Sequence, residues 1–125
     1  MQKLFNLIIG GTIGTLARYF LSGFTYQVFG SNFPYGTLVV NLIGCFIVGF
    51  LASIAEEKNL LDTNTRILLM AGFCGAFTTF STFILETSNL IKDGETIKAS
   101  LNVIFSVIIG FIVFRLGVLI AKIIY

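Results

Sequence analysis

Hydrophobic residues fill four long stretches of the chain, and short polar stretches separate them. The apolar stretches cover approximately residues 4–24, 36–55, 66–90 and 97–124. A bilayer has a hydrocarbon core of about 30 Å, which takes about 20 apolar residues in a helix, so each stretch is long enough for one crossing. The pattern therefore predicts an all-α membrane protein in which residues 1–125 form a single domain of four transmembrane helices.

The composition narrows the class of protein further. Of 125 residues, 56% are hydrophobic and only 11% are charged, and the mean hydropathy is +0.97, which is too apolar for a soluble globular domain. Four helices leave no room for a separate catalytic domain, and no pairing of a nucleophile with a base stands out, so enzymatic activity is not expected. The first apolar stretch lacks the cleavage pattern of a signal peptide and is interpreted as a retained helix.

The third apolar stretch has an unusual composition between Met70 and Phe83, where it reads MAGFCGAFTTFSTF. Its glycine and hydroxyl residues either form a close packing surface or mark a break in the helix near residues 75–79. Broken membrane helices line ion or substrate sites. Phe80 and Phe83 are three residues apart, which places both rings on one helix face beside hydroxyl side chains.

Arg18 is the one charged residue inside the first apolar stretch. It lies about 14 residues into the helix, roughly 21 Å across the membrane at 1.5 Å per residue. A guanidinium group there costs a few kcal/mol unless it reaches the interface or a wet cavity. It is therefore either a snorkelling side chain or a fixed positive charge that attracts anions into a vestibule. Earlier in the helix, Gly10 and Gly14 have the spacing that suits close helix contact.

Polar and small residues recur at four-residue spacing in two other stretches. The two stripes are Asn41, Cys45 and Gly49 in the second stretch, and Asn102, Ser106 and Gly110 in the fourth. The Asn41 amide either bridges two helices or donates to an anion. The stripe in the fourth stretch is either a helix-packing seam or the wall of a polar path. Cys45 and Cys74 are expected to pack as small hydrophobic side chains.

Charged residues are otherwise concentrated between the apolar stretches. Within the third stretch, Glu86 lies at a depth comparable with Arg18; an ion pair between them would explain both, so Glu86 receives no transport role. Residues 21–35 contain no charge and are expected to form a turn-rich linker. A short loop of the kind that flanks membrane helices carries Glu56, Glu57, Lys58, Asp62 and Arg66.

The basic residues are divided almost evenly between the two sides of the membrane. With four crossings, the side of both termini carries Lys3, Lys58, Arg66, Arg115 and Lys122, and the other side carries Arg18, Lys92 and Lys98. Orientation in the membrane follows the bias of basic residues, and here the bias is weak. The chain is therefore expected to insert in both orientations.

Three motifs together resemble the Fluc (CrcB-type) fluoride channel family: GGTIGTLAR at 10–18, GTLVVNLIG at 36–44 and GFCGAFTTFSTF at 72–83. The likeness extends in order over nearly the whole chain, and its FTTFSTF core is highly specific. The resemblance implies a passive fluoride-selective channel in the inner (plasma) membrane of a prokaryote, which exports fluoride and reduces its toxicity. It also implies an antiparallel, dual-topology homodimer with two narrow pores.

The resemblance also assigns roles to individual residues. Phe80 and Phe83 match the pore aromatics, Asn41 matches the pore amide, and Arg18 matches the vestibule charge. A structural sodium ion on the dimer axis would be held by the carbonyl groups of Gly75 and Thr78; Ala76, where many relatives carry a second glycine, is a small departure beside this site. Further donors along the path would be Ser81, Thr82, Asn102 and Ser106.

Fluoride chemistry is consistent with these assignments. Fluoride is small and strongly hydrated, so a pore must replace its water with a series of weak donors instead of one deep trap. The positive edges of Phe80 and Phe83 can face an anion without offering a strong hydrogen bond. Hydroxyl and amide groups can supply the remaining donors.

Two other functions compete with this interpretation. A small dual-topology multidrug antiporter also has four helices, but it needs a membrane-embedded acidic group and aromatic stacking for cations. The first stretch carries Arg18 and no carboxylate, and the chain has no tryptophan. A structural subunit without transport activity would explain the glycines, but it leaves the Phe-Ser-Thr-Phe cluster without a role.

Overall fold

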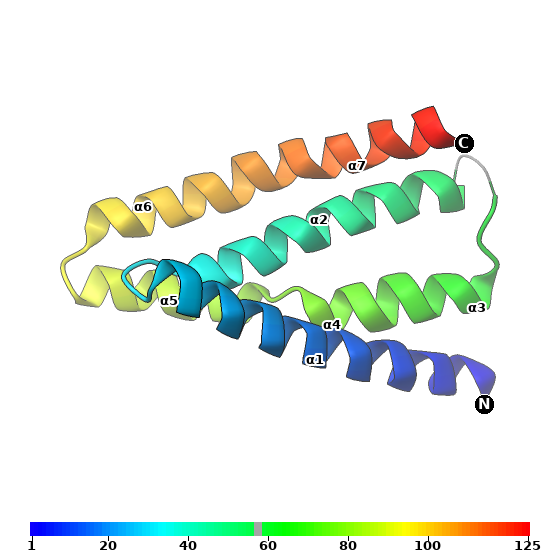
Figure 1. Ribbon diagram of the computed structural model, residues 1–125, viewed down its shortest axis with the longest axis horizontal. Helices are drawn as coiled ribbons and strands as arrows, with labels where there is room; N and C mark the ends of the chain where they lie inside the picture. The colour runs from blue at the N-terminus through cyan, green and yellow to red at the C-terminus, as the bar shows by residue number, and fades with distance from the viewer. Residues whose placement is uncertain (57–58) are drawn as a thin grey trace.

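The computed structural model describes residues 1–56 and 59–125, and in these residues it contains helices and no β-strand. Four helical spans are long and apolar enough to cross a membrane: Gln2–Phe29, Tyr35–Glu56, Thr63–Lys92 and Thr96–Ile124. Figure 1 shows them as an elongated bundle with both termini at the same end. The predicted all-α class with four membrane-spanning helices is confirmed. Within the charged loop, Glu57 and Lys58 lie outside the described residues.

Two of the four spans are single helices and two are composite. The first two spans are α1 (Gln2–Phe29) and α2 (Tyr35–Glu56). The third consists of α3 (Thr63–Arg66), a π-helical stretch η1 (Ile67–Cys74), α4 (Gly75–Phe77) and α5 (Phe80–Lys92). The fourth consists of α6 (Thr96–Ile104), a π-helical stretch η2 (Phe105–Ile109) and α7 (Gly110–Ile124). Because π-helical turns are frequent at functional sites, the residues beside η1 and η2 are of interest.

The first helix is longer than the sequence pattern indicates. It continues to Phe29, so most of the expected linker at 21–35 is helical, and only a short connection precedes α2. The polar residues at its end do not interrupt it because their hydroxyl groups donate to carbonyls of the same helix: Thr25 to Leu21 at 2.8 Å and Ser22 to Tyr19 at 3.3 Å. The helix ends at Phe29, and the residue that caps it is Gly30, whose φ of 82° favours glycine.

The third span is interrupted at Thr78 and Thr79, inside the expected stretch 75–79. Both residues are extended, with φ and ψ of −84° and 157° at Thr78 and −148° and 120° at Thr79. Thr79 then begins α5, because its hydroxyl oxygen accepts the backbone N–H of Thr82 at 3.3 Å. The small and hydroxyl residues of this stretch therefore form a real break and not only a packing surface.

Glycines bring the helices into close contact at two interfaces. A Cβ atom at Gly10 would lie 2.9 Å from the backbone nitrogen of Phe73, and one at Gly14 would lie 2.3 Å from its carbonyl oxygen. A Cβ atom at Gly117 would lie 2.3 Å from the carbonyl oxygen of Phe46. Larger residues would clash with backbone at each position, so the expected contact through Gly10 and Gly14 is confirmed, and a second one joins α2 to α7.

Two residues of the polar stripe in the fourth span have different roles: one packs against a helix and the other lines a cavity. Gly110 faces α2, where an added Cβ would lie 3.6 Å from the sulfur of Cys45, an ordinary van der Waals distance. Gly110 therefore belongs to the helix-packing seam. Ser106, one turn earlier, lines a cavity that is described below.

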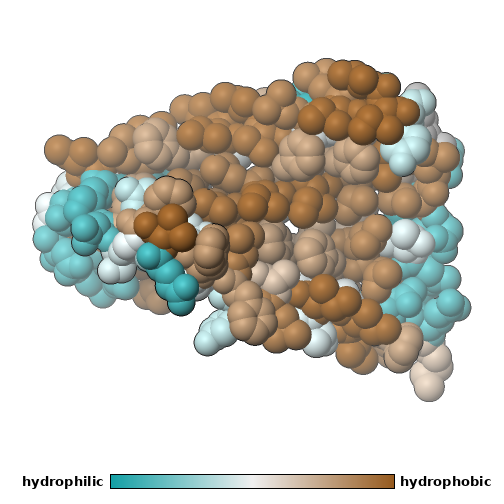
Figure 2. All heavy atoms as spheres, in the orientation of Figure 1, coloured by the Kyte–Doolittle hydropathy of each residue, from teal (hydrophilic) through white to brown (hydrophobic). Residues whose placement is uncertain are grey.

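Apolar side chains cover most of the bundle surface. Figure 2 shows a broad hydrophobic region across the middle of the molecule and hydrophilic residues gathered towards its two ends. Leu51, Ile54, Cys74 and Ala121 form the buried core between α2, η1 and α7. The free cysteine Cys74 therefore packs as a hydrophobic side chain, as expected. Such a surface is suited to contact with lipid tails.

Two charged side chains, one just before α3 and one at its end, stabilise the start of the third span. The hydroxyl of Thr65 donates to the carboxyl group of Asp62, and backbone N–H groups at the start of α3 donate to it as well. These hydrogen bonds cap α3 and hold the pKa of this carboxyl below its ordinary value. Arg66 donates to the carbonyl oxygens of Ala55 and Leu61, and so connects the end of α2 to the start of the third span.

Candidate functional site

The break in the third span is held open by the side chain of Asn41 in α2. Its Nδ2 donates to the carbonyl oxygen of Thr79 at 2.9 Å, and its Oδ1 accepts the N–H of Thr79 at 2.8 Å. The amide therefore pairs with both backbone groups of one residue, as a neighbouring strand would. Of its two possible roles, Asn41 has the bridging one in this structure, and one N–H of the amide is still available to donate elsewhere.

Arg18 reaches the same break from α1. Its Nε donates to the carbonyl oxygen of Ala76 at 3.0 Å. The half-buried side chain therefore points inward, towards the third span, and does not snorkel to the interface. Arg18 thus satisfies a carbonyl before the extended residues, and Asn41 satisfies the backbone groups of Thr79, the second of them.

Next to the break lies a cavity of about 350 Å³, which we call the aromatic cavity. Asn41, Phe80, Phe83 and Ser106 all line it, so α2, α5 and η2 each contribute to its wall. Four of the residues selected from the sequence are therefore brought together by the fold. The wall is mainly apolar and carries only a few polar groups, which suits a site that strips water from a small ion.

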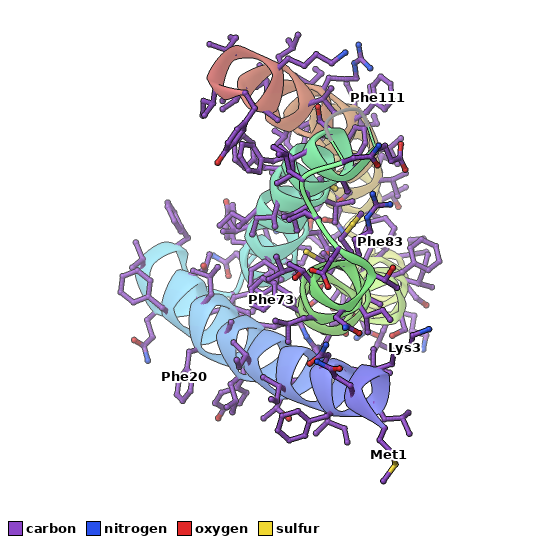
Figure 3. The ribbon with its side chains drawn as sticks, turned by 90° about the vertical axis from the view of Figure 1, so that its right-hand side faces the viewer. Met1, Lys3, Phe20, Phe73, Phe83 and Phe111 are labelled. Atoms are coloured by element: carbon purple, nitrogen blue, oxygen red, sulfur yellow. The ribbon has the colours of Figure 1, made fainter. Side chains whose placement is uncertain are left out.

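The two phenylalanine rings of the aromatic cavity differ in exposure. Their centroids are 5.8 Å apart and their planes are inclined by 42°. Phe83 is only 7% exposed, whereas Phe80 is 74% exposed. Figure 3 shows Phe83 among the side chains of the bundle, whereas Phe20 of α1 points away from it. The exposed ring of Phe80 would be covered only by lipid or by another chain.

Ser106 places a polar atom without a protein partner in the aromatic cavity. Its hydroxyl oxygen is buried and has no hydrogen-bond partner among the described residues. A buried hydroxyl without a partner is costly, so such a group in a cavity wall points to water or a ligand. Ser106 therefore offers a free donor beside the two rings.

A second, smaller cavity of about 150 Å³ lies on the other side of the break. Arg18, Thr82 and Glu86 line it. One oxygen of Glu86 accepts hydrogen bonds from the hydroxyls of Thr37 at 2.9 Å and Tyr26 at 3.0 Å. No ion pair between Arg18 and Glu86 forms in the described part of the chain, so hydroxyl groups take the place of the expected partner.

Tyr26 and Thr37 are functional candidates that the sequence analysis missed. Tyr26 lies in the stretch that was expected to be a linker, and Thr37 lies inside the GTLVVN motif without a distinctive pattern around it. The one sequence feature that could have identified Thr37 is its hydroxyl group near the start of an otherwise apolar helix. Only the tertiary contact with Glu86 distinguishes both residues from ordinary polar ones.

Three sequence-selected donors lie outside the aromatic cavity. Ser81 is exposed on the outside of the chain, and Thr82 lines the smaller cavity instead. Asn102 is 1% exposed and donates to the hydroxyl of Thr87 at 2.9 Å, and that hydroxyl donates to the carbonyl oxygen of Phe83 at 2.7 Å. In the single chain, Asn102 therefore supports the helix that carries Phe83 instead of lining the cavity.

Backbone carbonyls at the break are candidate ligands for a metal ion. Among the described residues no cluster of three or more Cys, Asp or Glu side chains could hold one. In an unbroken helix the Gly75 carbonyl would accept the N–H of Thr79, but here Asn41 takes that N–H. Within the described chain the carbonyl of Thr78 also accepts no hydrogen bond. Such oxygens match the ligand preference of hard cations.

Comparison with known proteins gives matches over almost the whole chain. A family model described as CrcB-like protein, Camphor Resistance (CrcB), matches residues 5–118. The chain is 44% identical over 124 residues to the fluoride-specific ion channel FluC of Solidesulfovibrio magneticus, covering 99% of each protein. It is 43% identical to the protein of the same name from Geotalea uraniireducens and 42% identical to that from Nitrosococcus oceani, covering 98% of each protein in both cases.

Proposed function

The chain belongs to the CrcB-like family, and from this membership we propose that it is a fluoride-specific ion channel through which fluoride leaves the cytoplasm passively. The structural observation that carries the proposal is the aromatic cavity, where two phenylalanine rings, the Asn41 amide and the unpartnered Ser106 hydroxyl surround one space beside a broken helix. A channel carries out no covalent chemistry, so the protein is not an enzyme.

The cavity wall has the properties that fluoride permeation requires. Its donors are weak and successive: the ring edges of Phe80 and Phe83, the hydroxyl of Ser106 and the free N–H of Asn41. Replacement of water in small steps avoids a deep binding site from which the ion could not leave. An interior-negative membrane potential then drives the anion outwards, by about 2.3 kcal/mol per charge per 100 mV.

The smaller cavity fits the role of a vestibule for the anion. Its positive charge is Arg18, and Thr82 adds a hydroxyl. The Glu86 carboxyl group in the same wall accepts hydrogen bonds from Tyr26 and Thr37. Ser81, exposed in the single chain, would meet a second chain packed against α5. Asn102 contributes to the path indirectly by holding Thr87 and thereby α5. A multidrug antiporter is not supported, because α1 carries no carboxylate to couple a cation to proton transfer.

Selective flux from liposomes tests the proposed function. Purified protein in vesicles loaded separately with fluoride, chloride or a quaternary ammonium salt is expected to release fluoride quickly and the other two ions at the rate of empty vesicles. Ion-selective electrodes and a fluorescent ammonium reporter measure the release. Proton-coupled release of the ammonium ion would instead identify an antiporter, and no release of any ion would favour a structural subunit.

We propose further that two copies assemble as an antiparallel homodimer in the inner membrane of a prokaryote. The exposed ring of Phe80 and the exposed Ser81 lie beside the aromatic cavity, so a second chain there would complete its wall. The weak bias of basic residues permits both orientations. The related proteins named above come from prokaryotes.

A sodium ion at the axis of this dimer is part of the same proposal. The carbonyl groups of Gly75 and Thr78 would hold it, and they fit because the break leaves them without donors from an ordinary helix. When bound, the ion would neutralise carbonyl oxygens that meet from two chains. Its role would be structural.

Labelling of a tagged terminus tests the dual orientation. A single cysteine added after Tyr125, in a chain whose Cys45 and Cys74 are replaced by alanine, is expected to react with a membrane-impermeant maleimide in about half of the molecules in intact cells, because the charge bias is weak. Permeabilised cells give the total for comparison. Labelling of all molecules, or of none, would rule out the antiparallel arrangement.

A further inference from the structure

We infer that Arg18 is a positioning residue for the cation site at the helix break, and not only a charge that attracts anions. The inference rests on the proposed function, because it concerns the sodium ion of the proposed dimer. The observation behind it is the hydrogen bond from Nε of Arg18 to the carbonyl oxygen of Ala76, at 3.0 Å. Ala76 lies next to Gly75, one of the two proposed ligands.

The hydrogen bonds at the break leave a specific set of carbonyls free. In a continuous helix, the carbonyls of Gly75 and Ala76 would accept the N–H groups of Thr79 and Phe80. Here the N–H of Thr79 is taken by Asn41, and the carbonyl of Ala76 accepts from Arg18. The carbonyl of Thr79 is also taken, by Asn41. Gly75 and Thr78 therefore keep carbonyls without a donor in the described chain, and each is followed by a residue whose carbonyl accepts from a side chain.

Fixation matters because α4 is too short to order these peptides by itself. It has three residues, Gly75–Phe77, and extended residues follow it directly. A peptide at such an end can rotate, and a carbonyl that swings towards the cation site would change the number of oxygens there. The bond to Arg18 removes this freedom at Ala76. The free carbonyl of the adjacent Gly75 is thus held in a fixed orientation before any ion binds.

The positive charge of Arg18, taken alone, would weaken sodium binding instead of strengthening it. A guanidinium group close to a cation site repels the cation, so as a pure charge Arg18 would weaken sodium binding. As a hydrogen-bond donor it would strengthen binding by ordering the ligands. The two effects have opposite signs, which makes them separable by substitution.

Three substitutions of Arg18 separate the hydrogen-bond donor from the charge of its side chain. In Arg18→Gln the amide nitrogen is attached to Cδ, as Nε is in arginine, so the donor is kept and the charge is lost. Arg18→Met has similar length but neither donor nor charge. Arg18→Lys keeps the charge but moves the nitrogen one atom farther along the side chain. Gln therefore tests the donor, and Lys tests the charge.

The measurement is the thermal unfolding midpoint of the purified dimer over a sodium titration, with ionic strength held constant by N-methylglucamine. We expect Arg18→Met and Arg18→Lys to need at least about tenfold more sodium than the wild type for half of the stabilisation, because a charged hydrogen bond to a ligand-bearing segment is lost. Arg18→Gln should stay within about threefold of the wild type. A merely structural role would lower the sodium-free midpoint and leave the sodium dependence unchanged.

Each other outcome overturns the inference. If Arg18→Met responds to sodium like the wild type, Arg18 does not position the site. If Arg18→Gln needs as much sodium as Arg18→Met for half of the stabilisation, the hydrogen-bond donor does not position the site. If the unfolding midpoint of the wild type does not change with sodium concentration, there is no cation site and this inference is wrong. The liposome assay with wild-type protein tests the fluoride channel independently of that result.

Discussion

Fluoride release from liposomes is expected to fall by up to about tenfold when Phe83 is replaced by isoleucine, and similarly when Phe80 is replaced. Isoleucine keeps the apolar volume but lacks the ring whose positive edge faces an anion. The same ring electrostatics contribute about 0.5–1.5 kcal/mol to a contact between two aromatic rings, and about 1.4 kcal/mol corresponds to a tenfold change in rate. Loss of one ring from a desolvated path should therefore slow permeation strongly.

The chain offers a matched control for this experiment. Phe111 on α7 is 66% exposed, close to the 74% of Phe80, but it does not line the aromatic cavity. Figure 3 shows it on the outside of the bundle. Phe111→Ile should release fluoride at the wild-type rate, and gel filtration should give the same size for all variants. If Phe80→Ile and Phe83→Ile release fluoride at the wild-type rate, neither ring contributes to the pore.

The second large effect is expected at Asn41, and it should appear in stability as well as in flux. Asn41→Leu leaves the N–H and the carbonyl of Thr79 without partners at a half-buried site. Each unsatisfied group costs about 1–3 kcal/mol, so the unfolding midpoint should fall clearly and fluoride release should be lost as the break rearranges. Thermal unfolding in detergent and liposome flux measure the two effects.

Two further variants separate the bridging role of Asn41 from an anion-donor role. Asn41→Asp keeps the acceptor for the N–H of Thr79 but sets a carboxylate against its carbonyl, so it should also be destabilising. Asn89→Leu, a change of the same size at an exposed position of α5, should leave stability within about 0.5 kcal/mol of the wild type. If Asn41→Leu abolishes flux but unfolds like the wild type, then Asn41 acts on the ion and does not hold the break.

The sequence located most of the relevant stretches because their signals are local. Apolar runs of about 20 residues define the spans without knowledge of their neighbours. The break lies where glycine and threonine replace larger apolar residues, because glycine and threonine have low helix propensities. The motifs at 10–18, 36–44 and 72–83 indicated the family, and the comparisons confirm it. The end of α1 was misjudged, because side-chain hydroxyls that bond back to their own helix look like turn residues in a sequence.

Tertiary contacts alone decided what the polar residues do. Asn41 and Thr79 are 38 positions apart, and Arg18 and Ala76 are 58 apart, so no local pattern could pair them. Arg18 and Glu86 have opposite charges at similar depth, which suggested an ion pair, but the rotation of each helix turns Arg18 to a carbonyl and Glu86 to two hydroxyls. Helix rotation and packing depend on glycine contacts between distant segments. Local sequence signals therefore define the spans, the position of the break and the family, whereas contacts between distant segments select which polar groups meet at the break.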